Sequence, residues 1–363
     1  MKPTTRKIAG LLGASALILG AAACGSGGDK DSGADAGGSD DKGSGGKVVI
    51  YSNSVNDGRG EWLAEQAKEA GFDIQTVDLG GGDVMNRLIS EKANPVADVT
   101  FGLNGVYYEK LKEADVLEAY EPSWADQVKD QPLDPDGLFW PIVREPIMLV
   151  YNTAVYTTPE EAPSDWPALW EEEKFHDLYE AKRSLGGATV QMVISGILTR
   201  YIDEDGHLGI SQEGWDNIAE YYKYANFEEE GVDLYARMAE GIVNIGQMWL
   251  AGKVTREDQY GVVTEAVHPE IGVPMVTQSV ALVKGAKHPE AAKEFIDWFG
   301  GAELQAAWSN EFGTAPTNVE AAANGDQAII EYTDSFKAQD IDWAFVAEHI
   351  DSWVEEIELN YIK

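Results

Sequence analysis

The chain has 363 residues, of which 44% are hydrophobic and 10% aromatic, and its formal net charge is −36. This much apolar surface can form a sizeable core, so a mostly disordered chain is excluded. The negative charge argues against nucleic acid and anionic lipid headgroups as partners. One cysteine excludes a disulfide scaffold and a cysteine-type zinc module.

Residues 1–23 have the layout of an export signal. Lys2, Arg6 and Lys7 precede an apolar run that ends in small residues before Cys24, and this run is too short to span a membrane with any margin. The position of the one cysteine resembles a bacterial lipobox, although Ala21 stands where that motif usually has Leu. The resemblance implies cleavage before Cys24 and attachment of a diacylglyceryl lipid to its sulfur. Ordinary cleavage, with Cys24 an incidental free thiol, is the alternative.

Residues 24–46 are dominated by Gly, Ser, Asp and Lys, with no apolar side chain larger than Ala after the cysteine. Such a composition cannot offset the entropy lost on ordering, so we expect a flexible tether. The chain from residue 47 onward is long enough for two domains of about 150 residues each.

The first part of this region alternates between strand and helix patterns. Strands are predicted over 47–52, 72–79 and 97–101, with helices over 60–70 and 84–92 between them. Alternation of this kind indicates a parallel sheet covered by helices. In open sheets of this class the ligand binds beyond the carboxyl ends of the strands. The corresponding loops are 53–60, 80–83 and 102–105.

Two long β-type runs, residues 146–152 and 272–283, predict two crossings between lobes and therefore a two-strand hinge. The chain between them is rich in Trp and Tyr and contains a Ser184–Val190 turn before a helix over 191–201. Three further helices are predicted over 290–298, 302–308 and 345–357. We predict an α/β fold with lobe 1 at 47–148 and 276–320, lobe 2 at 149–275 and C-terminal helices at 321–363.

The order of these landmarks resembles the extracellular solute-binding proteins of ABC importers, in the branch with ferric-ion-, thiamine-, sugar-phosphate- and phosphonate-binding members. The segments that carry the resemblance are Val48–Ser52, Asn86–Gly102, Val150–Thr153, Lys284–Phe299, Gln305 and Gly313–Asn318. It implies a periplasmic-binding-protein-like fold of class II type that closes on its ligand by hinge motion. It further implies delivery to a membrane permease. With the lipid anchor that the lipobox implies, we expect a monomer held at the outer face of the bacterial cell membrane.

Candidate ligand-binding residues lie in loops that face the predicted cleft: Asn53, Ser54, Gly82, Asn104, Ser184, Gly187, Thr189, Gln247 and Trp249. Their backbone N–H groups, hydroxyls and amides suit a small polar solute. The Gly80–Asp83 turn and Arg87 could hold an anion, but a tight turn with Asp83 as N-cap is the simpler interpretation. Trp140 could add an aromatic wall. Few cations stand in these loops, which weakens an anion as the ligand, whereas the acidic surface and the tryptophans favour an organic cation through cation–π contact.

Two alternatives remain open. Ferric members of the family hold their metal with adjacent tyrosines, but the corresponding stretch here, 241–251, contains none. Tyr221 and Tyr222 could substitute, although packing explains them better. The histidines have no metal-ligand spacing, so we predict no metal and no cofactor.

A cell-surface hydrolase would need a perturbed carboxylate pair. No nucleophile, zinc-protease or phosphate-loop motif is present, and we predict no enzyme.

Overall fold

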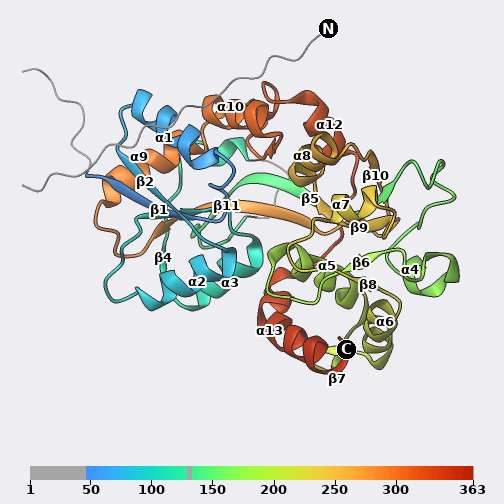
Figure 1. Ribbon diagram of the computed structural model, residues 1–363. Helices are drawn as coiled ribbons and strands as arrows, with labels where there is room; N and C mark the ends of the chain where they lie inside the picture. Colours follow the sequence, from blue (N-terminus) through green and yellow to red (C-terminus); the bar gives the residue numbers. More distant parts are fainter. Residues whose placement is uncertain (1–45, 129–132, 363) are drawn as a thin grey trace, which may run out of the picture. The chain divides into compact units, whose positions relative to one another are not determined.

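The computed structural model describes residues 46–128 and 133–362 (Figure 1). The predicted export signal, Cys24 and nearly all of the predicted tether lie outside the described residues. Within the described part, the main sheet runs in the order β10-β5-β11-β3-β1-β2, with β4, β9 and β12 pairing beside this path.

The first third of this region forms the predicted parallel sheet. β1 (Val48–Ser52) lies between β2 (Ile74–Asp78) and β3 (Val99–Phe101), and α1 (Arg59–Glu69), α2 (Gly81–Ser90) and α3 (Gly105–Glu113) follow these strands. The predicted alternation is therefore confirmed. The prediction of Asp83 as an N-cap is wrong, because the extended backbone of Gly80 starts α2 and leaves Asp83 inside its first turn.

Two antiparallel strands cross from one half of the molecule to the other. β5 (Trp140–Asn152) pairs with β11 (Met275–Val283), with a register shift between Gln278 and Ser279. β11 continues beside β3, whereas β5 continues beside β9 (Ile245–Trp249) and β10 (Thr264–Ala266). β5 begins before the predicted start at residue 146, because Pro141 and Pro146 both fit into its pairing with β11.

Separate hydrophobic cores lie at the two ends of this crossing. In the first half, one core packs beneath α9 (Pro289–Phe299) and α10 (Ala302–Phe312), and a second packs beneath α2 and α3. In the second half, one core involves α5 (Ala188–Leu198) and α6 (Gln212–Lys223), and another involves α7 (Leu234–Ala239) and α8 (Leu250–Tyr260). Apolar burial thus stabilises two lobes that share β5 and β11.

The last helix, α13 (Trp343–Asn360), buries Ile350 and Trp353 in the core that contains α5, and it also contacts α3 of the first lobe. An ion pair of 2.7 Å joins Lys110 to Asp351 at that contact. The remaining strands and α-helices of the described ranges are β4 (Leu117–Glu118), β6 (Glu180–Ala181), β7 (Ile202–His207), β8 (Asn226–Phe227), β12 (Ala315–Pro316), α4 (Ala168–Glu171), α11 (Val319–Ala322) and α12 (Gln327–Asp334). No helix of the described ranges combines the length and the apolar character needed to cross a membrane.

Candidate functional site

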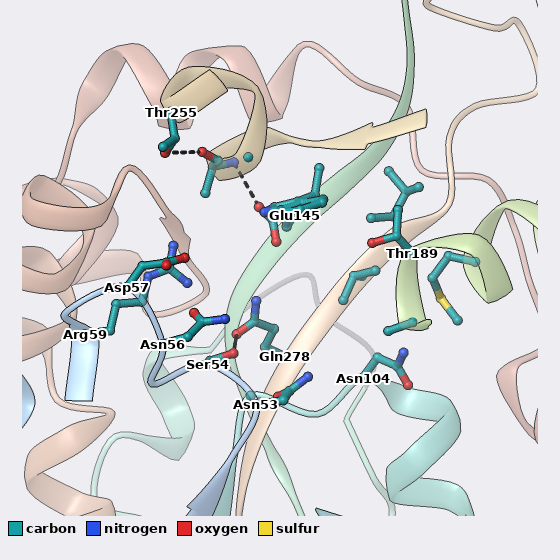
Figure 2. Close-up of a pocket in the computed structure, with 18 of the residues that line it drawn as sticks. Asn53, Ser54, Asn56, Asp57, Arg59, Asn104, Glu145, Thr189, Thr255 and Gln278 are labelled. Atoms are coloured by element: carbon teal, nitrogen blue, oxygen red, sulfur yellow. Dashed lines mark hydrogen bonds between the residues drawn. The ribbon is translucent and has the colours of Figure 1, made fainter. Parts of the chain in front are cut away.

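A pocket with a volume of about 240 Å³ lies where the loops after β1 and β3 meet the two crossing strands (Figure 2). Its walls come from both lobes. The lining includes Asn53, Ser54, Asn56, Asp57, Arg59 and Asn104 from the first lobe, Glu145, Ile147, Val276 and Gln278 from the crossing strands, and Thr189, Met192, Trp249, Thr255 and Arg256 from the second lobe.

Ser54 ties the first-lobe wall to the crossing strands. Its hydroxyl donates a hydrogen bond of 3.0 Å to Oε1 of Gln278. The loop approaches Gly102 so closely that a Cβ atom there would lie 2.5 Å from the Ser54 hydroxyl, and the φ of Gly102 is 91°. Glycine therefore permits this packing. Beside it, Oδ1 of Asn53 is buried without a hydrogen-bond partner in the described structure, while Asn104 caps α3.

Arg59 places a cation in the first-lobe wall. It is the first residue of α1 and is half-buried, with its guanidinium 5.4 Å from the ring centroid of Phe312. Across residues 46–128 and 133–362, no carboxylate forms a salt bridge with it. Arg59 thus stands outside the ion pairs of the described structure, and its charge acts on Glu145 across the pocket.

Glu145 brings a carboxyl group into the pocket from β5. The backbone N–H of Ala251, at the start of α8, donates a hydrogen bond of 3.1 Å to its Oε1. Burial raises the pKa of Glu145, and the opposing effects of Ala251, Arg59 and Gln278 do not cancel this increase. Its proton is thus held to a higher pH than that of a free glutamate.

The second-lobe wall consists of the first turns of α5 and α8 together with Trp249. Trp249 lies over the start of α8, where a Cβ atom at Gly252 would come within 2.5 Å of the indole. The guanidinium of Arg256 lies 4.7 Å from the centroid of that ring. Its Nε donates to Asp233 at 2.8 Å, so this cation already has a partner, unlike Arg59.

The predicted site residues divide between two neighbouring pockets. Asn53, Ser54, Asn104, Thr189 and Trp249 line the pocket of Figure 2. An adjoining pocket is lined by Ser184, Gly187 and Gln247, together with Thr189 and Trp249 again. Gly82 lies in the first turn of α2 and lines neither pocket. The binding roles of these residues stay predictions.

Other side chains have contacts away from the pocket. Trp140 donates through Nε1 to the carbonyl of Tyr120, and Arg87 pairs with Glu91. The sequence analysis missed Glu145. The adjacent charges of Arg144 and Glu145 inside the apolar run of β5 were a usable signal, because such strands rarely bury charged residues. Nothing in the sequence pattern pointed to Arg256 or Gln278.

Tyr221 and Tyr222 are buried in the core of the second lobe, and that burial raises the pKa of each phenol. Neither lines the pocket, whose described lining contains no tyrosine and no histidine. Elsewhere in the described ranges, no three His, Cys, Asp or Glu side chains are grouped so that they could hold a metal ion.

Comparisons with known proteins agree with this architecture. Residues 54–306 match the family model described as "Bacterial extracellular solute-binding protein". The "Probable ABC transporter periplasmic-binding protein y4fP" of Sinorhizobium fredii is 33% identical over 316 residues, which cover 86% of each chain.

Two solved structures show the same fold at lower identity. AfuA from Actinobacillus pleuropneumoniae, with exogenous fructose-6-phosphate bound, has a TM-score of 0.68 at 21% identity, covering 86% of this chain and 99% of that one. Iron-bound HitA from Pseudomonas aeruginosa has a TM-score of 0.71 at 16% identity, with the same coverage of 86% and 99%. The chain has the two-lobed α/β fold of periplasmic binding proteins, and it belongs to the bacterial extracellular solute-binding proteins, as the solute-binding component of an ABC importer.

Proposed function

We propose that this protein captures a small organic solute that carries an anionic group together with hydroxyl or amino groups. The observation that carries the proposal is Arg59, a half-buried cation in the pocket that forms no salt bridge with another described residue. A planar guanidinium suits a carboxylate or phosphate, which it can bind through two parallel hydrogen bonds. This ligand class replaces the organic cation that the sequence favoured.

The other groups of the pocket suit the rest of such a solute. The unpartnered Oδ1 of Asn53 can accept a hydrogen bond, and the carboxyl of Glu145 faces the same space. Closure of the lobes would exclude water and strengthen these polar contacts. The fructose-6-phosphate of the AfuA structure combines an anion with hydroxyls, which supports this class. The solute is then delivered unchanged to the permease, and no catalytic step is proposed.

Titration calorimetry and thermal shift with fructose 6-phosphate, 2-aminoethylphosphonate, thiamine and iron(III) would test the proposal. The melting temperature should rise with the concentration of an anionic solute, because a ligand that binds only the folded state stabilises it. Arg59→Gln should weaken binding by about 1.5–3 kcal/mol, the contribution of a hydrogen bond to a charged group. Arg87→Gln is the matched control, since Arg87 pairs with Glu91 outside the pocket. Tight binding of thiamine or iron(III) alone, or turnover of any probe, would contradict the proposal.

The proposed working form is a monomer anchored through a lipid on Cys24. The support is the sequence pattern of a basic start, an apolar run and small residues before the one cysteine. Cys24→Ser should leave ligand binding intact and release the protein from bacterial membranes. Since one acyl chain gives only marginal binding, more than one is implied. A Cys24→Ser protein that still sediments with salt-washed membranes would disprove the anchor.

A further inference from the structure

A second pocket, with a volume of about 440 Å³, adjoins the one in Figure 2. Both pockets are lined by Ala188, Thr189, Trp249 and Arg256, so these residues form the partition between them. A solute bound in the first pocket therefore lies close to the second.

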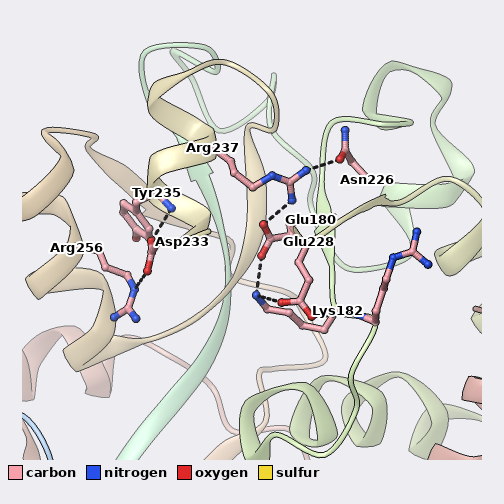
Figure 3. A network of polar contacts seen from close by, with 9 residues as sticks. Glu180, Lys182, Asn226, Glu228, Asp233, Tyr235, Arg237 and Arg256 are labelled. Atoms are coloured by element: carbon pink, nitrogen blue, oxygen red, sulfur yellow. Dashed lines mark hydrogen bonds and ion pairs between the residues drawn. The ribbon is translucent and has the colours of Figure 1, made fainter. Parts of the chain in front are cut away.

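The charged side chains of the second pocket are already paired (Figure 3). Nζ of Lys182 lies 2.8 Å from Glu180 and 2.9 Å from Glu228, and Arg256 pairs with Asp233. Behind them, the buried Arg237 pairs with Glu180 at 2.6 Å. A charged ligand group would have to break one of these pairs or remain without a counter-ion, both of which are unfavourable. The pocket therefore suits an uncharged group.

Gln247 brings a buried polar atom without a partner to this pocket, as far as the described residues show. It is only 7% exposed, and its Oε1 is buried with no hydrogen bond to the described structure. Leaving a buried polar atom unpaired is unfavourable, so a ligand hydrogen bond here would be gained at little cost. A carboxamide both donates and accepts, as a hydroxyl does. Around it, Val232, Leu234 and Met248 offer apolar surface to a carbon frame.

We infer that the second pocket is a subsite for the uncharged, hydroxyl-bearing part of a solute, with Gln247 as the residue that selects for it. The inference rests on the proposed function, because Arg59 holds the anionic group of the same solute. The two pockets together then discriminate by length: a short anionic solute fills the first, and a longer hydroxylated one also reaches Gln247.

Calorimetry with glycerol 3-phosphate and fructose 6-phosphate as short and long probes would test this subsite. Gln247→Met keeps the side-chain length and removes the hydrogen bond. The affinity for fructose 6-phosphate should fall about fivefold to tenfold, which corresponds to the loss of one hydrogen bond. The affinity for glycerol 3-phosphate should change less than about twofold. Gln278→Met, in the first pocket, is the matched control and should weaken the binding of both probes alike. The melting temperature of ligand-free Gln247→Met should not fall, because no protein hydrogen bond to Oε1 is lost.

Equal effects of Gln247→Met on both probes, or no effect on the longer one, would overturn the subsite while leaving the proposed function standing. If neither phosphate binds the wild-type protein, sugar and polyol phosphates are excluded as its solutes, while the other anionic solutes of the proposed function stay open to their own test. Crystals soaked in fructose would then decide the subsite by itself. A sugar hydroxyl within hydrogen-bond distance of Gln247 would support it, and only water in that pocket would overturn it.

Discussion

The two walls of the pocket each contain an arginine, but only one of these has a free charge. Arg59, in the first-lobe wall, has no salt bridge to another described residue, whereas Arg256, in the second-lobe wall, is held by Asp233 at 2.8 Å and stacked on Trp249. The number of cations around a pocket is therefore a poor guide to its ligand. What matters is which of them the protein has already neutralised.

The difference follows from how each wall is built. The first wall is a loop at the carboxyl end of β1, where short polar side chains follow the strand directly. Behind the second wall, the ion pairs of Figure 3 join β6 to α7 through Glu180 and Arg237, and α8 to the start of α7 through Arg256 and Asp233. We therefore expect changes in the first wall to alter affinity, and changes behind the second wall to alter stability.

The largest expected effect is on stability, in the second lobe. Arg237→Met leaves the side chain of Glu180, 2% exposed, without its closest cation. Breaking a buried pair by removing one partner costs about 3–5 kcal/mol. The free energy of unfolding, measured in urea, should fall by about that amount.

The double variant Arg237→Met with Glu180→Gln should recover much of this loss, because the buried charge of Glu180, left with Lys182 as its partner, is removed as well. Lys223→Gln is the surface control: its pair with Glu220, at 2.9 Å, joins two largely exposed side chains, so stability should hardly change. If Arg237→Met is no more destabilising than Lys223→Gln, the ion pairs do not support the second wall.

A smaller effect, on affinity, is expected in the first wall. Ser54→Ala removes the 3.0 Å hydrogen bond that orients the carboxamide of Gln278. One such bond is worth about 1 kcal/mol, so binding of the anionic solute should weaken about fivefold. Calorimetry would measure the change, and urea unfolding would check that stability is nearly retained. Unchanged affinity would mean that Gln278 does not contact the solute.

Much of this architecture followed from sequence pattern alone. The spacing of residues 47–101 was sufficient for the parallel sheet, and the loops after its strands supplied Asn53, Ser54 and Asn104. The second wall was less accessible, because the pairing of Arg256 with Asp233 depends on how α8 packs against the start of α7. Gln247 was a candidate, but its separation from the first pocket depends on side-chain packing, which the periodicity of the sequence does not predict.

The smallest expected effect concerns Glu145, where the two walls meet the crossing strands. Burial raises its pKa above that of the unfolded chain, so its contribution to stability is fully present below the unfolded value of about 4.3 and is lost as the pH rises through the folded value. Glu145→Gln cannot ionise and keeps an acceptor for the Ala251 N–H. The variant should therefore gain stability relative to wild type as the pH rises through this window, and remain more stable at neutral pH.

Urea unfolding at a series of pH values would measure the difference, with Glu331→Gln on the exposed face of α12 as the control. A difference that stays constant with pH would show that Glu145 is solvated like a surface carboxylate, and the contrast between a charged first wall and a neutralised second wall would then rest on Arg59 alone.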